Sequence, residues 1–401
     1  MGKLSLRVSR SMPKLATLTA EDLSALGASE SSIRWLSKPS ADSIRYLDII
    51  ESRSDQFGRP PMAQLGAVVE FEGQPLVYVV DNRALASGGG TGHDEIEQTL
   101  RLLACRGDEA YLAILEYGRI VVHPIQLRGK DFSGVPLNMS LMGHRSLIQD
   151  LVAETIPGLP RRNARRAAVH DLLFRLLSQV ADQLLETKAL HKQHDDVLAL
   201  VGRALFARFL IDRNIMTSAT FPALKDAPEN CFSTPRLAAL TCKWLDVKFN
   251  GELLPLGGGN YRNYFDSFGD EAETVFRVLS NLMYRAPDGQ LSFESQWGDL
   301  DFAHVPIGLF SEVYERYAHR HVGPNAAEES MHYTPRHIAE FMIDEAFEGL
   351  APELRHRARL LDPASGGGVF LTLGFRKLVA ELWKTNRRRP SRREIRRKPR
   401  H

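Results

Sequence analysis

Residues 359–371, with the sequence RLLDPASGGGVFL, constrain the fold more than any other segment of this 401-residue chain. An apolar strand end comes first, followed by the acidic Asp362, a glycine-dense turn and an apolar helix start. Glycines let the backbone approach a ligand closely, and a helix N-terminus presents unpaired N–H groups. In a parallel sheet, such a turn lies at the carboxyl edge, where nucleotides and cofactors bind. The segment therefore predicts the beginning of a doubly wound α/β domain.

A second segment, MHYTPR at residues 331–336, lies about 28 residues upstream of this turn. Its proline is well placed to open a helix, which we expect over 338–347. Together the two segments resemble the cofactor motifs of N-6 adenine-specific DNA methyltransferases, which bind S-adenosylmethionine. The helical sequence LFARFLIDR at 205–213 is similar to the segment upstream of the methyltransferase core in type IIG and type I-like restriction-modification or phage-defence enzymes.

The resemblance implies a Rossmann-like methyltransferase domain, S-adenosyl-L-methionine as cofactor and double-stranded DNA as partner. In the family motif, Ser365 stands where a cysteine is usual and Gly367 where a serine is usual. Both replacing residues are small, so the turn can still form. The cofactor-binding residues that the resemblance implies are Tyr333, Thr334, Pro335, Asp362, Pro363, Ala364, Ser365, Gly366, Gly368 and Phe370.

The family's base pocket has no counterpart in this sequence. These enzymes flip adenine out of the duplex and hold it with an Asn/Asp-Pro-Pro-Tyr/Phe motif. No Pro-Pro pair follows Pro60-Pro61, and only 30 residues follow Leu371, where a doubly wound domain needs roughly 100 more. We therefore expect a truncated or split methyltransferase that has no catalytic residues of its own and is inactive alone. Its partner would be a chain carrying the remaining half or a specificity subunit; the alternative is a non-catalytic DNA-binding or scaffold subunit.

Residues 55–130 predict a small α/β module. Apolar runs predict two β-hairpins, one formed by 67–71 with 76–80 and one by 111–115 with 119–125. Between the hairpins, the apolar residues of 94–104 have helical spacing. A nuclease of this kind would present acids and a nearby lysine to bind Mg²⁺. The candidate acids are Asp55, Glu70, Glu72 and Asp81, but the only lysines before residue 188 are Lys3, Lys14, Lys38 and Lys130. We expect a nuclease-like scaffold without cleavage activity, and a metal-dependent nuclease is the weakest alternative.

The middle of the chain predicts helices. Leucines and valines form one apolar stripe over 168–188, the pattern repeats over 195–215, and the short link between them implies an antiparallel pair. Further helices are expected at 236–245 and 271–284. We expect five parts: an N-terminal helical and loop segment (1–54), the α/β module (55–130), a helical region (131–300), the start of the methyltransferase domain (301–383) and a basic tail (384–401).

The net charge of +2 hides an asymmetry between body and tail. Residues 384–401 hold ten lysines and arginines and one acid, Glu394, which leaves 41 basic and 48 acidic residues on the first 383 positions. The tail either contacts DNA or is a solvated linker, and the sequence does not decide between these two interpretations. The tail residues considered for DNA binding are Arg387, Arg388, Arg389, Arg392 and Arg393.

Cysteine content and hydropathy bear on the cellular compartment of the protein. Cys105, Cys231 and Cys242 are widely spaced and form no C-x-x-C pair, so neither a disulfide framework nor a metal site is expected. The basic N-terminus is not followed by an apolar stretch of secretory type, and 197–211 is too short and too charged to span a bilayer. These features favour a cytoplasmic protein without a membrane partner.

Overall fold

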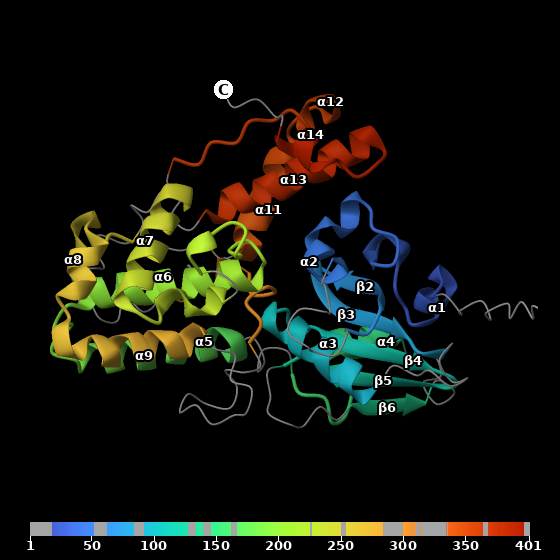
Figure 1. Ribbon diagram of the computed structural model, residues 1–401. Helices are drawn as coiled ribbons and strands as arrows, with labels where there is room; N and C mark the ends of the chain where they lie inside the picture. The colour runs from blue at the N-terminus through green and yellow to red at the C-terminus, as the bar shows by residue number, and fades with distance from the viewer. Residues whose placement is uncertain are drawn as a thin grey trace, which may run out of the picture.

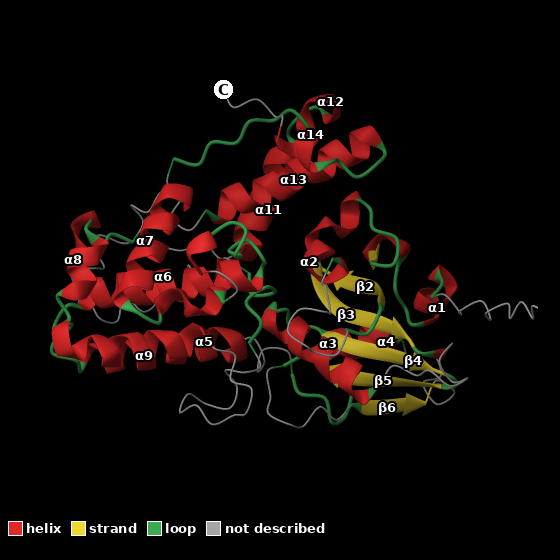
Figure 2. Ribbon diagram, in the orientation of Figure 1, coloured by secondary structure: helices red, strands yellow, loops and turns green. Residues whose placement is uncertain are grey.

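The computed structural model describes residues 18–51, 62–83, 92–126, 134–138, 146–161, 167–224, 227–249, 254–283, 300–306, 308–309, 313, 334, 336–363 and 368–396. They form a mixed α/β fold with three parts, which are an α/β module, a helical bundle and a C-terminal helix unit (Figure 1). Figure 2 shows that all the strands belong to the module and that the other two parts are helical.

The module is built on a six-stranded sheet whose strands lie in sequence order. The strands are β1 (Ile33–Trp35), β2 (Leu65–Phe71), β3 (Gln74–Asp81), β4 (Tyr111–Glu116), β5 (Arg119–Pro124) and β6 (Val135–Asn138). Neighbouring strands are antiparallel except β3 and β4, which are parallel from Val77 opposite Tyr111 to Asp81 opposite Leu115. A parallel pair needs a crossover connection, and α3 (His93–Cys105) is the helix that lies in it.

Both predicted hairpins are confirmed. The turn between β2 and β3 has positive φ at Glu72 (51°) and Gly73 (70°), the backbone that matches the twist of a two-residue hairpin. The turn between β4 and β5 has Gly118 at φ 74°. The predicted helix at 94–104 is also confirmed as α3.

Other elements cover both faces of the sheet. The side chains of β3 and β4 are therefore buried on both faces, which explains why these strands have continuous apolar sequences. On one face, Val69, Val77 and Val79 pack in a core with α1 (Ala20–Ala25) and α4 (Leu147–Ala153). On the other face, Val68 and Val80 belong to a core that continues through α3 into the helical bundle. The α/β module and the bundle therefore share one hydrophobic core.

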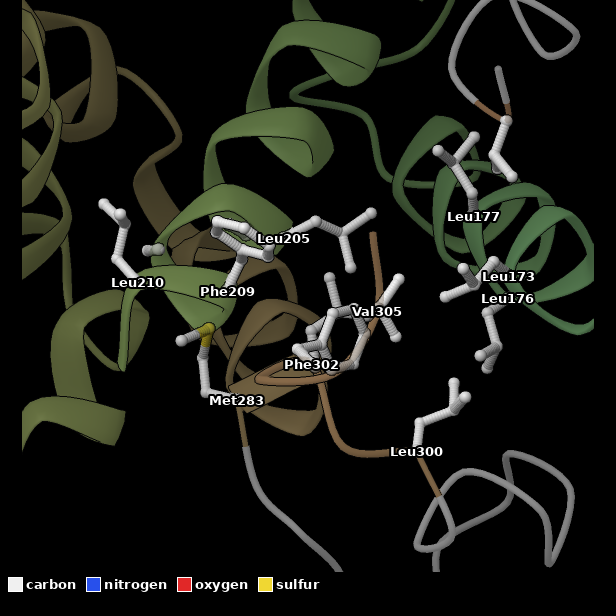
Figure 3. Packing of buried hydrophobic residues seen from close by; sticks show 14 of the residues in the cluster. Leu173, Leu176, Leu177, Leu205, Phe209, Leu210, Met283, Leu300, Phe302 and Val305 are labelled. Atoms are coloured by element: carbon white, nitrogen blue, oxygen red, sulfur yellow. The ribbon is translucent and has the colours of Figure 1, made fainter. Parts of the chain in front are cut away.

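The bundle confirms the predicted antiparallel pair, because α5 (Ala167–Leu185) packs on α6 (His194–Asp212). The predicted helices at 236–245 and 271–284 are confirmed as α7 (Pro235–Phe249) and α9 (Ala272–Met283), and α8 (Tyr261–Asp266) lies between them in sequence. Leucines of α5 and the side chains of Leu205 and Phe209 from α6 face each other across Phe302 and Val305 (Figure 3). Helix α6 is buried around most of its circumference, which makes it the central helix of the bundle.

The C-terminal unit consists of α11 (Arg336–Glu348), α12 (Pro352–Arg355), α13 (Val369–Asn386) and α14 (Arg392–Arg396). The helices predicted after Pro335 and after the glycine turn are thus both present. Ala339, Ile343 and Phe347 of α11 pack with Leu373 of α13 in a small core. Ala380 and Trp383 of α13 pack on the module at η2 (Ala41–Tyr46) and α2 (Leu47–Ile50).

The structure departs from the sequence prediction at residues 359–361. These residues were expected to end an apolar strand, but within the described ranges every strand belongs to the β1–β6 sheet and none pairs with this stretch. The side chain of Leu361 is 87% exposed. A strand exists only through hydrogen bonds to a neighbour, and the described residues supply no neighbour here. No helix in the described part of the chain has the length and apolarity to cross a bilayer.

Candidate functional site

The predicted cofactor residues lie at the starts of α11 and α13. The structure describes Thr334, Asp362, Pro363, Gly368 and Phe370, while Tyr333, Pro335, Ala364, Ser365 and Gly366 lie outside the described residues. Thr334 stands two residues before α11, and Gly368 is the N-cap residue of α13. Whether the two segments meet depends on how the helices are arranged.

Helices α11 and α13 lie side by side and run in the same direction. Asp344 and Lys377, each the ninth residue of its helix, form an ion pair. Arg376 of α13 interacts electrostatically with Arg336 and Glu340 in the first half of α11. Leu360, in the segment that returns the chain, packs against Gly374, where an added Cβ would lie 2.5 Å from its Cδ2 atom. The two helix starts, and with them Thr334 and Gly368, therefore lie at the same end of the unit.

Gly368 adopts a left-handed conformation, with φ 73° and ψ 26°, and α13 begins at the next residue. Among the described residues, nothing lies within 4 Å of a Cβ added at Gly368, and the positive φ is what favours glycine at this position. The first N–H groups of α13 have no carbonyl partner within the helix, as at every helix start. Asp362 is half-buried and Pro363 is exposed, whereas Phe370 packs against the core of the helix unit.

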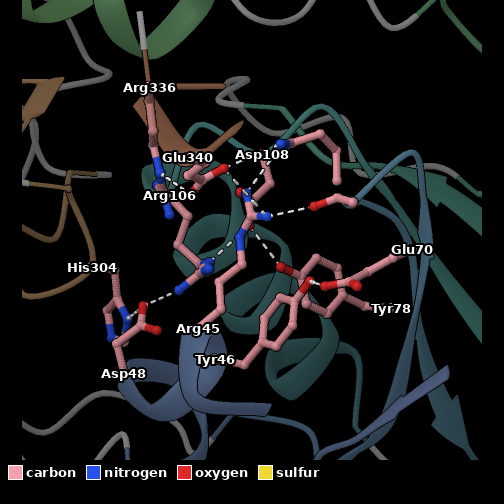
Figure 4. A network of polar contacts seen from close by, with 12 residues as sticks. Arg45, Tyr46, Asp48, Glu70, Tyr78, Arg106, Asp108, His304, Arg336 and Glu340 are labelled. Carbon is pink, nitrogen blue, oxygen red and sulfur yellow. Dashed lines mark hydrogen bonds and ion pairs between the residues drawn. The ribbon is translucent and has the colours of Figure 1, made fainter. Parts of the chain in front are cut away.

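A polar network joins the start of α11 to the α/β module (Figure 4). Its centre is Glu340, whose carboxylate accepts a hydrogen bond from Arg336 Nε at 2.9 Å and one from Gln74 Nε2 at 3.2 Å. Arg45 Nη1 lies 3.7 Å from the same carboxylate and donates to the carbonyl of Gly73 at 2.7 Å. Because Gln74 opens β3 and Gly73 is in the hairpin turn, α11 is fixed to the β2–β3 hairpin.

Arg106, buried at the end of α3, holds the second half of the network together. Its guanidinium pairs with Asp108 at 2.8 Å and with Asp48, and Tyr78 donates its hydroxyl to Asp108 at 2.6 Å. Burial acts to raise the pKa of Asp108, but the positive charges of Arg106 and Arg45 and the hydrogen bonds from Tyr78 and Arg106 together outweigh it and hold that pKa below its usual value. His304 Nδ1 lies 3.9 Å from Asp48, which brings the segment after the bundle into the same network.

Sequence reasoning did not single out this network. These residues share no periodic spacing: Arg45 is in η2, Asp48 in α2, Arg106 and Asp108 in the loop after α3, and Glu340 in α11. Gln74 and Glu340 are 266 residues apart in sequence. The only sequence signal was that Arg336 and Glu340 are one turn apart at the start of the helix that follows Thr334.

Two of the four candidate nuclease acids, Glu70 and Asp81, are engaged in other contacts. Glu70 pairs with Arg34 at 2.8 Å and accepts a hydrogen bond from the hydroxyl of Tyr46 at 2.6 Å. Asp81 pairs with Arg83 at 2.9 Å, Glu72 is in the hairpin turn, and Asp55 lies outside the described residues. No group of three or more histidine, cysteine, aspartate or glutamate residues placed to hold a metal occurs in the described part of the chain.

The tail arginines differ in their surroundings. Arg388 pairs with Glu394 at 2.6 Å, and Arg389 pairs with Glu51 of the module and lies over the ring of Trp383, 5.8 Å from its centroid. Arg387 and Arg393 are exposed, and the side chain of Arg392 is not among those described. Comparisons of the chain with protein-family models, with curated proteins and with solved structures find no match.

Proposed function

We propose that this chain is the cofactor-binding and DNA-binding component of an adenine-specific DNA methyltransferase of a restriction-modification or phage-defence system. Its cofactor is S-adenosyl-L-methionine, held at the common end of α11 and α13. The observation that supports this proposal best is the position of Thr334 and Gly368. Two segments that resemble one family's cofactor motifs lie about 28 residues apart in sequence and at one end of a packed helix pair.

The residues at this end suit a small charged cofactor. The first N–H groups of α13 have no acceptor within the helix and are hydrogen-bond donors for its polar groups, and no atom of the described residues lies within 4 Å of a Cβ added at Gly368. Asp362 lies just before the turn and places a carboxylate beside it. The bound cofactor supplies an electrophilic methyl group. Orientation of that group toward an extruded adenine is the main contribution expected of the protein.

The base pocket belongs, in this proposal, to a partner chain that carries further strands. Leu361 and the helices α11 and α13 present large apolar side chains to solvent, which is unusual for a surface without a partner. The exposed side chains, between 40% and 87% accessible, are Ile338, Phe341, Met342, Leu361, Leu371 and Phe375. A sheet whose edge pairs with residues 358–362 would cover this face and hold the adenine. The chain alone is therefore expected not to methylate DNA.

Hydrogen exchange of the full chain, with and without S-adenosylmethionine, tests the cofactor assignment. We expect protection of the first turns of α11 and α13 and none in α8. Gly368→Ala forces a residue with a side chain into a left-handed backbone and should remove the protection. Gly349→Ala is the matched control, because Gly349 has no positive φ and its added Cβ meets only ordinary contacts at 3.7 Å. Unchanged exchange at both helix starts in the unmodified chain would contradict the proposal.

A non-catalytic DNA-binding or scaffold subunit is the second candidate function. The observation in its favour is that Arg389 pairs with Glu51 of the module, so the tail helps to dock the C-terminal unit on the module. This candidate predicts duplex DNA binding with no change in hydrogen exchange on addition of S-adenosylmethionine. The same exchange experiment therefore separates the two functions.

A further inference from the structure

Helix α7 of the bundle carries a second apolar stripe in addition to the one that attaches it to the core. The buried residues of α7 share one helix face, and they are Ala238, Thr241, Cys242 and Leu245. On another face, the side chains of Leu240 and Val247 are 37% and 74% exposed and belong to none of the hydrophobic cores. Helix α6 separates α7 from α5 and α9 (Figure 1), and the described residues leave this second face open.

The second stripe has the spacing of a coiled-coil seam. Four side chains separated by three, four and three residues form it: Leu237, Leu240, Trp244 and Val247. This alternation is that of positions a and d in a heptad repeat. Trp244 is held in one orientation, because its ring stacks on Phe221 with centroids 5.5 Å apart and its Nε1 donates to the carbonyl of Thr220 at 3.1 Å. A half-buried tryptophan fixed in this way is a suitable anchor for a partner helix.

The charged side chains beside this seam are all positive. Arg236, Lys243 and Lys248 occupy the flanking e and g positions, are exposed, and have no acid in ion-pair contact among the described residues. The one acid of α7, Asp246, pairs instead with the buried Arg203 at 2.8 Å. Charges at e and g select the partner of a seam, because they meet the corresponding charges of the other helix. A second copy of α7 would bring like charges together, whereas an acidic helix would bring opposite ones.

We propose that α7 is a docking surface for an amphipathic helix of a partner protein, with apolar residues at its own a and d positions and aspartate or glutamate at e and g. Apolar contact around Trp244 supplies most of the affinity, and the three cations reject basic helices. The surface involves neither α11 nor α13, so it does not depend on the proposed cofactor.

A synthetic peptide of about three heptads, with leucine at a and d and glutamate at e and g, tests this surface on the full chain. Anisotropy of the labelled peptide should show saturable binding, and a peptide with lysine at e and g should bind about tenfold more weakly. Val247→Glu should weaken binding of the acidic peptide by about tenfold or more, because the seam loses a buried apolar contact. Tyr117→Glu is the matched control, since Tyr117 is 70% exposed in the turn between β4 and β5. Neither variant should change the melting temperature.

Charge reversal tests the selection of the partner. The double variant Lys243→Glu and Lys248→Glu should prefer the peptide with lysine at e and g, by about tenfold over the acidic peptide. Lys188→Glu is the matched control, because Lys188 is exposed in the link after α5, and it should keep the preference of the unmodified chain.

Several results would overturn the proposal. One is the absence of saturable binding of the acidic peptide to the unmodified chain, and another is equal binding to the Val247→Glu chain. Binding of single-stranded DNA or of anionic phospholipid vesicles that displaces the peptide and is lost in Val247→Glu would assign the seam to nucleic acid or to a lipid surface. Dimerisation of the unmodified chain that Val247→Glu abolishes would assign the seam to a second copy.

Discussion

At the scale of single residues, the charged side chains of α6 have a structural role. Arg208 and Asp212 are both buried one turn apart, with Arg208 Nε 3.1 Å from Asp212 Oδ2. Arg208 also donates Nη1 to the carbonyl of Leu282 at 2.9 Å, and Asp212 accepts from the backbone N–H of Phe302 at 3.1 Å. The pair therefore joins α6 to the end of α9 and to residues 300–306.

Such residues explain why a sequence predicts a buried helix more easily than its contacts. The apolar stripes of α5 and α6 predict that the two helices pack, and they do. In the same stripes, Arg203 and Arg208 interrupt the apolar pattern. Hydrophobic spacing cannot predict which carbonyl or carboxylate group a buried guanidinium contacts. Arg203 Nε in fact donates to the carbonyl of Leu254 at 2.8 Å, 51 residues away.

Asp108 gives a prediction about pH at this scale. Its pKa is lower in the folded protein than the ordinary value of 3.8, so its stabilising contribution is complete above about pH 4 and is lost as pH falls through the folded value. Asp108→Asn should lower the free energy of unfolding by about 3 kcal/mol at pH 7, since it leaves Arg106 short of a buried partner. The difference from the unmodified chain should shrink below pH 4.

Urea unfolding at pH 7, 4 and 3 measures both effects. Asp266→Asn is the control, because Asp266 is exposed and lies 3.8 Å from Arg262. That variant should change stability by less than about 0.5 kcal/mol. A penalty for Asp108→Asn that is the same at every pH would contradict the role assigned to the charge.

At the scale of elements, strong periodic patterns were predicted well and short or isolated elements were not. The hairpins, α3 and the helices of the bundle follow from alternation or helical spacing. Strands β1 and β6 were missed because they have three and four residues, and β6 contains Pro136. The strand expected at 359–361 is absent for the opposite reason: its residues suit a strand, but no described strand pairs with it.

Docking of α13 on the module gives a prediction at this scale. Trp383 is only 9% exposed and packs with Ala380 against η2 and α2. Trp383→Ala should weaken this docking by about 3 kcal/mol, as for other large-to-small core changes. Hydrogen exchange should become faster in α11, α13 and η2 and stay unchanged in β3 and β4, which belong to separate cores.

The control for Trp383→Ala lies on the same helix. Leu371 is 40% exposed, so Leu371→Ala should leave the exchange of η2 as it is in the unmodified chain. Equal acceleration in the two variants would show that the effect does not come from the contact of Trp383 with the module.

At the scale of the whole molecule, the candidate site depends on contacts that only the folded chain creates. The sequence predicted the two helix starts and the residues around Gly368, because the pattern of acid, glycines and apolar residues is local. It did not predict that Arg45, Asp48 and Arg106 would lie beneath α11 and α13. Those contacts join parts of the chain up to 295 residues apart, between Arg45 and Glu340, and no local pattern encodes them.

DNA binding by the tail gives a prediction about the whole chain. Arg387 and Arg393 are exposed, so each is available to neutralise a phosphate and release a counterion. Replacement of both by glutamine should reduce the slope of log affinity against log salt concentration by about 2. Fluorescence anisotropy with a labelled duplex at several salt concentrations measures the slope, and Arg262→Gln should leave it unchanged. A slope equal to that of the unmodified chain would favour the hypothesis that the tail is a solvated linker.

The position of Glu340 has a mechanical consequence. It lies about one turn from the start of α11, where it pairs with Arg45 of η2 and accepts a hydrogen bond from Gln74, next to the turn of the β2–β3 hairpin. A ligand that shifts the start of α11 must either break these contacts or move the hairpin with the helix. The shift of the helix start and the movement of the hairpin then share one coupling free energy. Binding at either place changes the affinity at the other by the same factor. Whatever binds the outer face of the hairpin would thereby change the affinity at the helix starts, without touching them.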